Sequence, residues 1–154
     1  MASFGSTSQG RLSECDDLIQ IVCYDAIQVV DFSIITGHRG KAEQNAKYPK
    51  YSKVKWPNSK HNSFPSKAID IAPYIKPYGA IYGNTQDIEK ITQLRNVSKR
   101  EANDFILKAY ARTLGVIEAM AYRRGISIRL GMDWDMDYDL VDQTFHDLGH
   151  WELL

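Results

Sequence analysis

The apolar positions of the chain follow two patterns, one typical of helices and one typical of strands. Around residues 13–30 apolar side chains recur every three or four positions, which predicts a helix. A shorter helix is predicted over 85–96. The clearest helix is predicted over 99–124, because an S-x-x-E capping box begins at Ser98 and Gly125 follows the last apolar position.

Short runs of β-branched and apolar residues predict the strands. Between the first two strands lies a polar stretch, residues 37–67, with prolines at 49, 57 and 65. It is predicted to be a long loop with a short helical turn near 41–47, and long structured loops in compact domains are often functional. The predicted strands are 32–37, 68–75, 126–131 and the C-terminal HWELL, 150–154.

The order of these elements defines the expected fold class. The chain reads helix, strand, loop, strand, two helices, strand, loop, strand, without a regular βαβ alternation. This order indicates an α+β fold in which a small, mainly antiparallel sheet packs with helices. A length of 154 residues suits one domain with a substantial core. Residues 1–11 are expected to be a flexible N-terminus, and 12–154 a single domain.

Composition and charge narrow the possible partners. The 19 basic and 19 acidic residues give a formal net charge of zero, which argues against a protein held on nucleic acid by bulk electrostatics. No apolar run approaches the ~18 residues of a membrane span. The polar N-terminus shows no secretory signal, so synthesis in the cytoplasm is expected. Cys15 and Cys23 are interpreted as core thiols without a disulfide.

One histidine and one aspartate in SKHNSFPSKAID, His61 and Asp70, suggest two ligands of a metal site. His150, in the C-terminal FHDLGHWELL, would supply a third. Two histidines and one carboxylate with an open fourth position are typical of catalytic zinc. Each residue also has a plain structural interpretation: a loop histidine bound to a backbone carbonyl, a cap at the edge of a strand, and a half-buried sheet histidine.

Zinc-assisted hydrolysis also needs a carboxylate that accepts the proton of the attacking water. Asp147 is the first candidate. Residues three apart on a strand face opposite sides, so Asp147 can approach the metal only if the chain bends, and Gly149 permits a bend. Glu152 is the alternative, because positions 150 and 152 share one face of a strand.

A second acidic group lies at DWDMDYD, where Asp133, Asp135, Asp137 and Asp139 alternate. Alternating carboxylates can hold calcium, but the glycine and the glutamate of a standard calcium loop are missing. The acidic loop 133–142 is therefore either a calcium site or a solvated loop.

Four motifs resemble, in order, those of the M15 zinc peptidases. SKH at 59–61 followed by AID at 68–70 resembles the SxH…AxD motif of that family. FHDLGHWEL at 145–153 is similar to its closing (D/E)xxH(W/F)EL motif. ISIRLGMDW at 126–134 resembles IRWGGDW, and GHR…EQ at 37–44 resembles GxR…EQ. The resemblance covers residues 12–154.

The resemblance implies the D-Ala-D-Ala-peptidase, or hedgehog-like, fold. The family contains D-Ala-D-Ala carboxypeptidases, dipeptidases and phage L-alanyl-D-glutamate endopeptidases, which cut peptidoglycan stem peptides. Small size and the lack of a signal fit a phage endolysin that waits in the host cytoplasm and then attacks the wall from the periplasmic side. The alternatives are a D-Ala-D-Ala carboxypeptidase and a non-catalytic phage structural or wall-binding domain. We expect a monomer.

The resemblance also implies roles for individual residues. Zinc is expected on His61, Asp70 and His150, with Asp147 as general base and acid. Arg39 is expected near the scissile carbonyl or a substrate carboxylate, which suits the fixed fork of a guanidinium. Ser59, Gln44 and Trp134 are expected to contact substrate.

The sequence departs from the family pattern in three ways. The spacing from His61 to Asp70 is two residues longer than usual, so residues 62–67 should bulge. Met132 replaces a glycine and Leu130 replaces a tryptophan.

Overall fold

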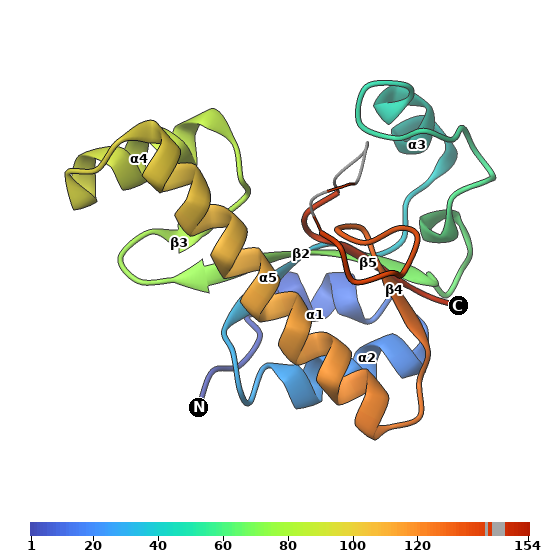
Figure 1. Ribbon diagram of the computed structural model, residues 1–154. Coiled ribbons are helices and arrows are strands. Elements are labelled where there is room, and N and C mark those ends of the chain that lie inside the picture. The colour runs from blue at the N-terminus through green and yellow to red at the C-terminus, as the bar shows by residue number, and fades with distance from the viewer. Residues whose placement is uncertain (141, 143–146) are drawn as a thin grey trace.

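The computed structural model describes residues 1–140, 142 and 147–154. Its helices and strands follow the predicted order (Figure 1). The helices are α1 (Ser6–Leu12), α2 (Asp17–Ala26), α3 (Lys41–Lys47), the short 3-10 helix η1 (Lys60–Asn62), α4 (Thr85–Arg95) and α5 (Lys99–Arg123). The strands are β1 (Phe32–Thr36), β2 (Ala68–Ile75), β3 (Gly79–Ala80), β4 (Ile128–Leu130) and β5 (His150–Leu153).

The strands form one antiparallel sheet in the order β1-β2-β5-β4, and β3 pairs with the far end of β2. The predicted α+β fold with a small antiparallel sheet is confirmed. The register between β2 and β5 places Asp70 directly opposite His150. The pairing of β1 with β2 becomes irregular between Ile34 and Thr36, close to Asp70. The sheet therefore aligns two of the predicted ligands, which are 80 residues apart in sequence.

Helix α5 supplies much of the core. Its buried residues recur every three or four positions, so they form one stripe along the helix. This stripe contacts β2, β4 and α2, and Figure 1 shows α5 running across the molecule beside them. Ser98 and Glu101 form the predicted capping box, and Gly125 adopts φ +68°, as expected for the residue after a helix. The fully buried side chains include Ile19, Ile34, Ile69, Ile71, Leu114, Ile117 and Trp151.

The N-terminus differs from its prediction as a flexible segment. Residues 6–12 form α1, and Phe4 is buried with ring contacts to Tyr24 and Phe32 at 5.8 and 5.2 Å. The Ser8 hydroxyl also accepts a hydrogen bond from Ile34 N–H on β1. Tertiary contacts of this kind order a polar segment whose own sequence gives no helical pattern.

The first predicted helix begins four residues too early. Helix α2 starts at Asp17, and the carboxylate of Asp16 caps it by accepting Leu18 N–H. Cys15 therefore lies before the helix, where its backbone forms an isolated β-bridge with that of Ser66. Cys15 and Cys23 are both buried and free, which confirms the prediction of core thiols without a disulfide. Across the described residues, no helix combines the length and apolar character needed to cross a bilayer.

Candidate metal centre

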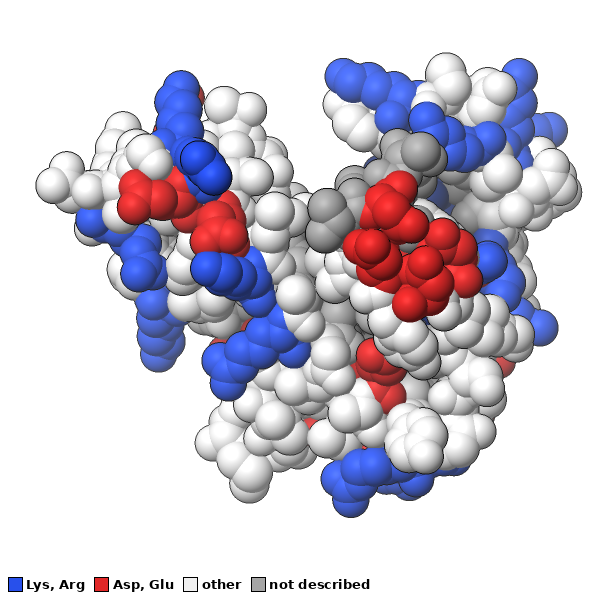
Figure 2. All heavy atoms as spheres, viewed as in Figure 1, with Lys and Arg blue, Asp and Glu red and all other residues white. Residues whose placement is uncertain are grey.

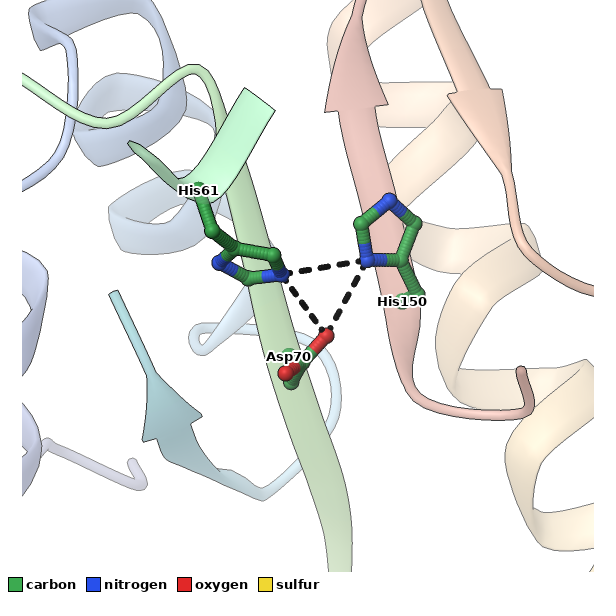
Figure 3. A group of neighbouring side chains, drawn as sticks. All are labelled: His61, Asp70 and His150. Atoms are coloured by element: carbon green, nitrogen blue, oxygen red, sulfur yellow. Dashed lines mark hydrogen bonds and ion pairs between the residues drawn. The ribbon is translucent and has the colours of Figure 1, made fainter. Parts of the chain in front are cut away.

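Three side chains from separate parts of the chain meet at one point (Figure 3). His61 comes from η1, Asp70 from β2 and His150 from β5. Nε2 of His61 lies 3.1 Å from Oδ1 of Asp70 and 3.2 Å from Nδ1 of His150, and Nδ1 of His150 lies 3.1 Å from the same Oδ1. The structure thus brings together the three ligands predicted from the sequence.

Local structure explains how His61 reaches this point. Ser59 caps η1 by accepting His61 N–H, and the side chain of Asn62 closes the capping box. The backbone oxygen of His61 accepts Arg39 N–H at 2.8 Å, which ties η1 to the segment after β1. Residues between η1 and β2 are held as well, since Ser66 N–H donates to Glu14 O. The longer spacing before Asp70 is therefore accommodated by an anchored loop.

Each of the three side chains is also held on its outer side. Nδ1 of His61 lies 2.8 Å from Gly37 O, and Nε2 of His150 lies 3.1 Å from Oε2 of Glu152. Arg39 donates from Nη2 to Oδ2 of Asp70 at 3.0 Å. Because a carbonyl and a carboxylate can only accept, both histidines carry their proton on the outer nitrogen in the neutral form.

The inner atoms are consequently all acceptors. The lone pairs of two imidazole nitrogens and a carboxylate oxygen face one another at 3.1–3.2 Å, which is unfavourable unless positive charge lies between them. Ligand atoms around a tetrahedral zinc lie about 3.3 Å apart, because each is about 2.0–2.1 Å from the ion. The donor set and its spacing therefore fit a divalent cation with room for a fourth ligand.

Electrostatics at the site favour the same conclusion. Burial opposes charge on Asp70, but the two neighbouring imidazoles outweigh burial and hold the pKa of Asp70 well below its usual range. Burial likewise opposes charge on His150, yet hydrogen bonds to Asp70 and Glu152 raise the pKa of His150 to about 9. Both shifts mean that positive charge is favoured where the three side chains meet, whether a proton or a metal ion carries it.

Glu152 lies on the far side of the His150 ring from the meeting point. Its carboxylate is buried, 2.5 Å from Nη2 of Arg129 and 3.6 Å from Nζ of Lys60. Burial would raise the pKa of Glu152, but the bonds to His150 and Arg129 outweigh it and lower the pKa to about 2. Glu152 is therefore an ionised support for His150. The sequence placed Glu152 and His150 on the same face of a strand, and the contact agrees with that. It suggested Glu152 as the alternative general base, however, and not as a partner of His150.

Asp147 occupies the turn that precedes β5. Its backbone N–H donates to Gly131 O, its backbone oxygen accepts His150 N–H, and residues 148–149 turn the chain as expected. Gly149 allows the backbone of the turn to approach that of β2 closely, since a Cβ there would lie 2.3 Å from Ile71 O. Burial and then the charge of Asp70 raise the pKa of Asp147. The Asp147 side chain lines the same pocket as His61 and His150.

Arg39 and Gln44 lie deeper than the sequence suggested. Arg39 is only 6% exposed, and besides Asp70 it bonds Oε1 of Gln44 at 3.1 Å. Gln44, expected to contact substrate, is completely buried and donates to Ser52 Oγ and Val54 O. This places Gln44 behind Arg39 as a support, which is a correction to the expected substrate contact. The polar side chain of Gln44 can be buried there because the buried guanidinium of Arg39 needs a hydrogen-bond acceptor.

The remaining predicted residues line a pocket of about 350 Å³ beside the meeting point. Ser59 lines this pocket, although its hydroxyl is used to cap η1. Trp134 also lines it, with its ring 5.2 Å from that of His150 and beneath the guanidinium of Arg129. The pocket is thus lined by two of the candidate ligands, His61 and His150, together with Asp147, Arg39 and the ring of Trp134.

The acidic loop forms a second group of carboxylates. Asp133, Asp135 and Asp137 each offer an oxygen, and these oxygens lie within 4.8 Å of one another. The carboxylate of Asp133 already accepts the backbone N–H groups of Asp137 and Tyr138 at 3.2 and 3.1 Å. The fourth aspartate of the pattern, Asp139, is not in this group.

Comparison with known proteins agrees with the fold. Residues 1–109 match the family of phage L-alanyl-D-glutamate peptidases, a family of peptidoglycan peptidases. The chain belongs to this family, which confirms the resemblance found in the sequence. The match includes His61 and Asp70, whereas Asp147 and His150 lie beyond it. No match was found among curated proteins.

A solved structure shares the fold. The crystal structure of the Serratia marcescens L-Ala D-Glu endopeptidase ChiX superposes with a TM-score of 0.65 at 19% sequence identity. The alignment covers 99% of this chain and 90% of that chain. The similarity thus extends over β5, which carries His150.

Proposed function

We propose that the protein is a zinc-dependent endopeptidase that hydrolyses the L-Ala–D-Glu bond of peptidoglycan stem peptides. The observation that carries this proposal is the convergence of three acceptor atoms, from His61, Asp70 and His150, at the edge of a pocket. Membership of the phage L-alanyl-D-glutamate peptidase family supplies the substrate class. Zinc is favoured because two imidazoles and one carboxylate form a common catalytic set for this ion.

The chain's own residues have distinct tasks. Nε2 of His61, Oδ1 of Asp70 and Nδ1 of His150 would hold the ion, which would lower the pKa of a bound water and polarise a carbonyl oxygen. Asp147 accepts the proton of the attacking water and passes it to the leaving amine. The raised pKa of Asp147 suits the first step, because a carboxylate that binds a proton more tightly accepts it more readily.

Arg39 places a fixed positive charge beside the reacting carbonyl. Its guanidinium lines the pocket, and the contacts to Asp70 and Gln44 leave it one orientation. Such a preoriented donor stabilises the oxyanion that develops during the attack. Ser59 and Trp134, which line the pocket, contact the bound peptide.

Two finer points belong to the same proposal. The protein acts as an endolysin: it accumulates in the host cytoplasm as a monomer and reaches the wall from the periplasmic side during lysis.

A calcium ion on Asp133, Asp135 and Asp137 would fix the acidic loop beside Trp134. Activity that does not respond to calcium, after mild chelation that leaves zinc in place, would remove the calcium site.

The decisive experiment is digestion of purified peptidoglycan by the wild type and by His150→Ala, with and without a chelator. Products identified by mass should be stem peptides that begin with glutamate, formed only by the wild type with metal. Release of terminal D-alanine instead would identify a D-Ala-D-Ala carboxypeptidase. No chelator-sensitive cleavage at all would favour a non-catalytic wall-binding domain.

A further inference from the structure

Charged side chains of both signs gather on one face of this chain, whose formal net charge is zero. Figure 2 shows Lys and Arg over the lobe that contains α3, and Asp and Glu on the rim beside it. Neither the net charge nor these surface groups decide which sign of charge a ligand meets inside the pocket. That sign depends on the residues that line the pocket, because their fields act at short range.

Lys60, Arg129 and Glu152 all line the pocket beside the candidate metal centre, and they form one ion-pair group. Nη2 of Arg129 lies 2.5 Å from Oε1 of Glu152, and Nζ of Lys60 lies 3.6 Å from the same oxygen. Because both nitrogens are tied to one atom, a single carboxylate ligand can contact both. Two cations share one carboxylate here, so the group carries one positive charge in excess.

The excess charge is accessible from the pocket. The side chains of Arg129 and Lys60 are 34% and 36% exposed, whereas that of Glu152 is only 7% exposed. A ligand in the pocket therefore reaches the two cations more easily than the carboxylate that they share. An anionic group of the ligand is attracted there, and a cationic group is repelled.

Arg129 and Lys60 also keep hydrogen-bond donors for a ligand. Oε1 of Glu152 accepts from Nε and Nη2 of Arg129 at 3.2 and 2.5 Å, and the guanidinium lies over the ring of Trp134 at 5.2 Å. No other described residue accepts a hydrogen bond from this guanidinium, so three of its five N–H donors remain. Nζ of Lys60 donates to Leu153 O, and an ammonium has three donors. Both cations can thus bind a further anion without releasing Glu152.

We infer that Arg129 and Lys60 form an anion subsite that binds the free carboxylate of the residue after the scissile bond. The inference rests on the proposed function. In an alanyl-glutamyl bond the glutamyl residue follows the cleavage point, and only one of its two carboxyl groups continues the chain. The other is an anion close to the reacting amide. A guanidinium held in one orientation suits it, because the fork of N–H donors matches a carboxylate.

The subsite lies at a suitable separation from the reaction centre. His150 directs Nδ1 at the meeting point of the candidate ligands, and Nε2 on the other side of its ring lies 3.1 Å from Glu152. One imidazole ring and one carboxylate therefore separate the ligand atoms from Arg129. The glutamyl carboxylate is likewise only a few bonds from the scissile amide. Since the alanyl side chain is uncharged, the subsite would also fix the direction in which the peptide lies.

The test compares Arg129→Gln/Lys60→Gln with the wild type, at saturating zinc, on two soluble stem peptides. The peptides differ at one group: the glutamyl carboxyl that does not continue the chain is free in one and amidated in the other. On the free acid, the double variant should lose at least about tenfold in kcat/KM, mainly through KM. On the amide it should lose much less. The wild type's preference for the free acid should weaken as salt is added.

The ratio of kcat/KM for the free acid to that for the amide separates recognition from support. If Arg129 and Lys60 only held Glu152, their loss would lower activity on both peptides alike and leave this ratio unchanged. Arg129→Lys, which keeps the charge but not the fork, should retain part of the preference. The single variants Arg129→Gln and Lys60→Gln should each lose part of it, and they answer the question if the double variant does not fold.

A matched control removes the same charge elsewhere. Lys99 and Arg112 are exposed on α5 and do not line the pocket, so Lys99→Gln/Arg112→Gln should keep the wild-type ratio. An equal fall of the ratio in this control would mean that net charge is responsible, and the inference would fail. It would also fail if the wild type showed no preference for the free acid.

Failure of the proposed function would be seen separately. If the wild type with zinc cleaves neither peptide, the endopeptidase proposal fails, and calorimetric titration of both uncleaved peptides then tests the subsite by itself. Tighter binding of the free acid by the wild type, lost in Arg129→Gln/Lys60→Gln, would uphold the subsite. Equal affinities of the wild type for the two peptides would overturn it.

Discussion

The Nε2 atom of His150 lies 3.1 Å from Oε2 of Glu152, and this contact determines which nitrogen of the imidazole faces His61 and Asp70. The carboxylate there accepts a hydrogen bond from Nε2–H, so in the neutral imidazole the lone pair is on Nδ1. Glu152 is in turn held by Arg129 and Lys60. The orientation of His150 as a candidate ligand therefore depends on Glu152 and its ion-pair partners, none of which is a candidate ligand.

Glu152→Ala should lower zinc affinity by about 10–100-fold, because partners of this kind orient a ligating histidine and raise its basicity. Competition with a chelator of known affinity measures the effect. Glu89→Ala, an exposed carboxylate on α4, is the control. Unchanged affinity in a folded Glu152→Ala protein would show that His150 does not need this support.

Arg39→Ala should reduce kcat by about 10²–10³ at saturating zinc, the usual cost of one lost oxyanion donor. Arg39→Lys should recover only part, since an ammonium cannot reproduce the two contacts to Asp70 and Gln44. Saturating metal is essential, because Arg39 also holds Oδ2 of Asp70. If Arg39→Ala kept the wild-type kcat at saturating zinc, Arg39 would act only by holding Asp70.

Asp147→Asn should retain zinc and lose about 10²–10⁴ in kcat, the range for a positioned general base. Metal content and steady-state rates are measured on the same sample. Asp104→Asn, on the exposed face of α5, is the control. A variant that still turns over at the wild-type rate would return Glu152 to consideration as the base.

Gly131→Ala should destabilise the site although Gly131 carries no side chain. A Cβ there would lie 2.4 Å from Asp147 O and 2.9 Å from Cβ of His150, so the turn before β5 must shift. We expect a lower midpoint of unfolding and lower activity. Gly115→Ala on α5, where a Cβ meets nothing within 4 Å, should instead stabilise by about 0.5–1 kcal/mol. Equal effects of the two substitutions would contradict the close approach.

Sequence alone predicted the elements whose signals are local. Ser98 and Gly125 mark the ends of α5, and both act as caps in the structure. The candidate ligands could be chosen because His61, Asp70 and His150 lie in motifs with a fixed order. Their meeting depends on the register of β2 with β5, which follows from the antiparallel sheet.

Features that depend on distant contacts could not be predicted in this way. Helix α1 is ordered by Phe4 against Phe32 and by Ser8 against β1, none of which is visible in a local pattern. Gln44 has the polarity of a surface residue, but it is buried because it satisfies Arg39 and Ser52. The pairing of Glu152 with Lys60 likewise joins residues that are far apart in sequence.

Anomalous diffraction at the zinc edge, from crystals of the zinc-loaded protein, tests the central claim most directly. We predict one ion, about 2.0–2.2 Å from Nε2 of His61, Oδ1 of Asp70 and Nδ1 of His150, with a solvent molecule as fourth ligand. No anomalous peak among these three side chains, or an ion bound elsewhere while they keep a proton between them, would contradict the account.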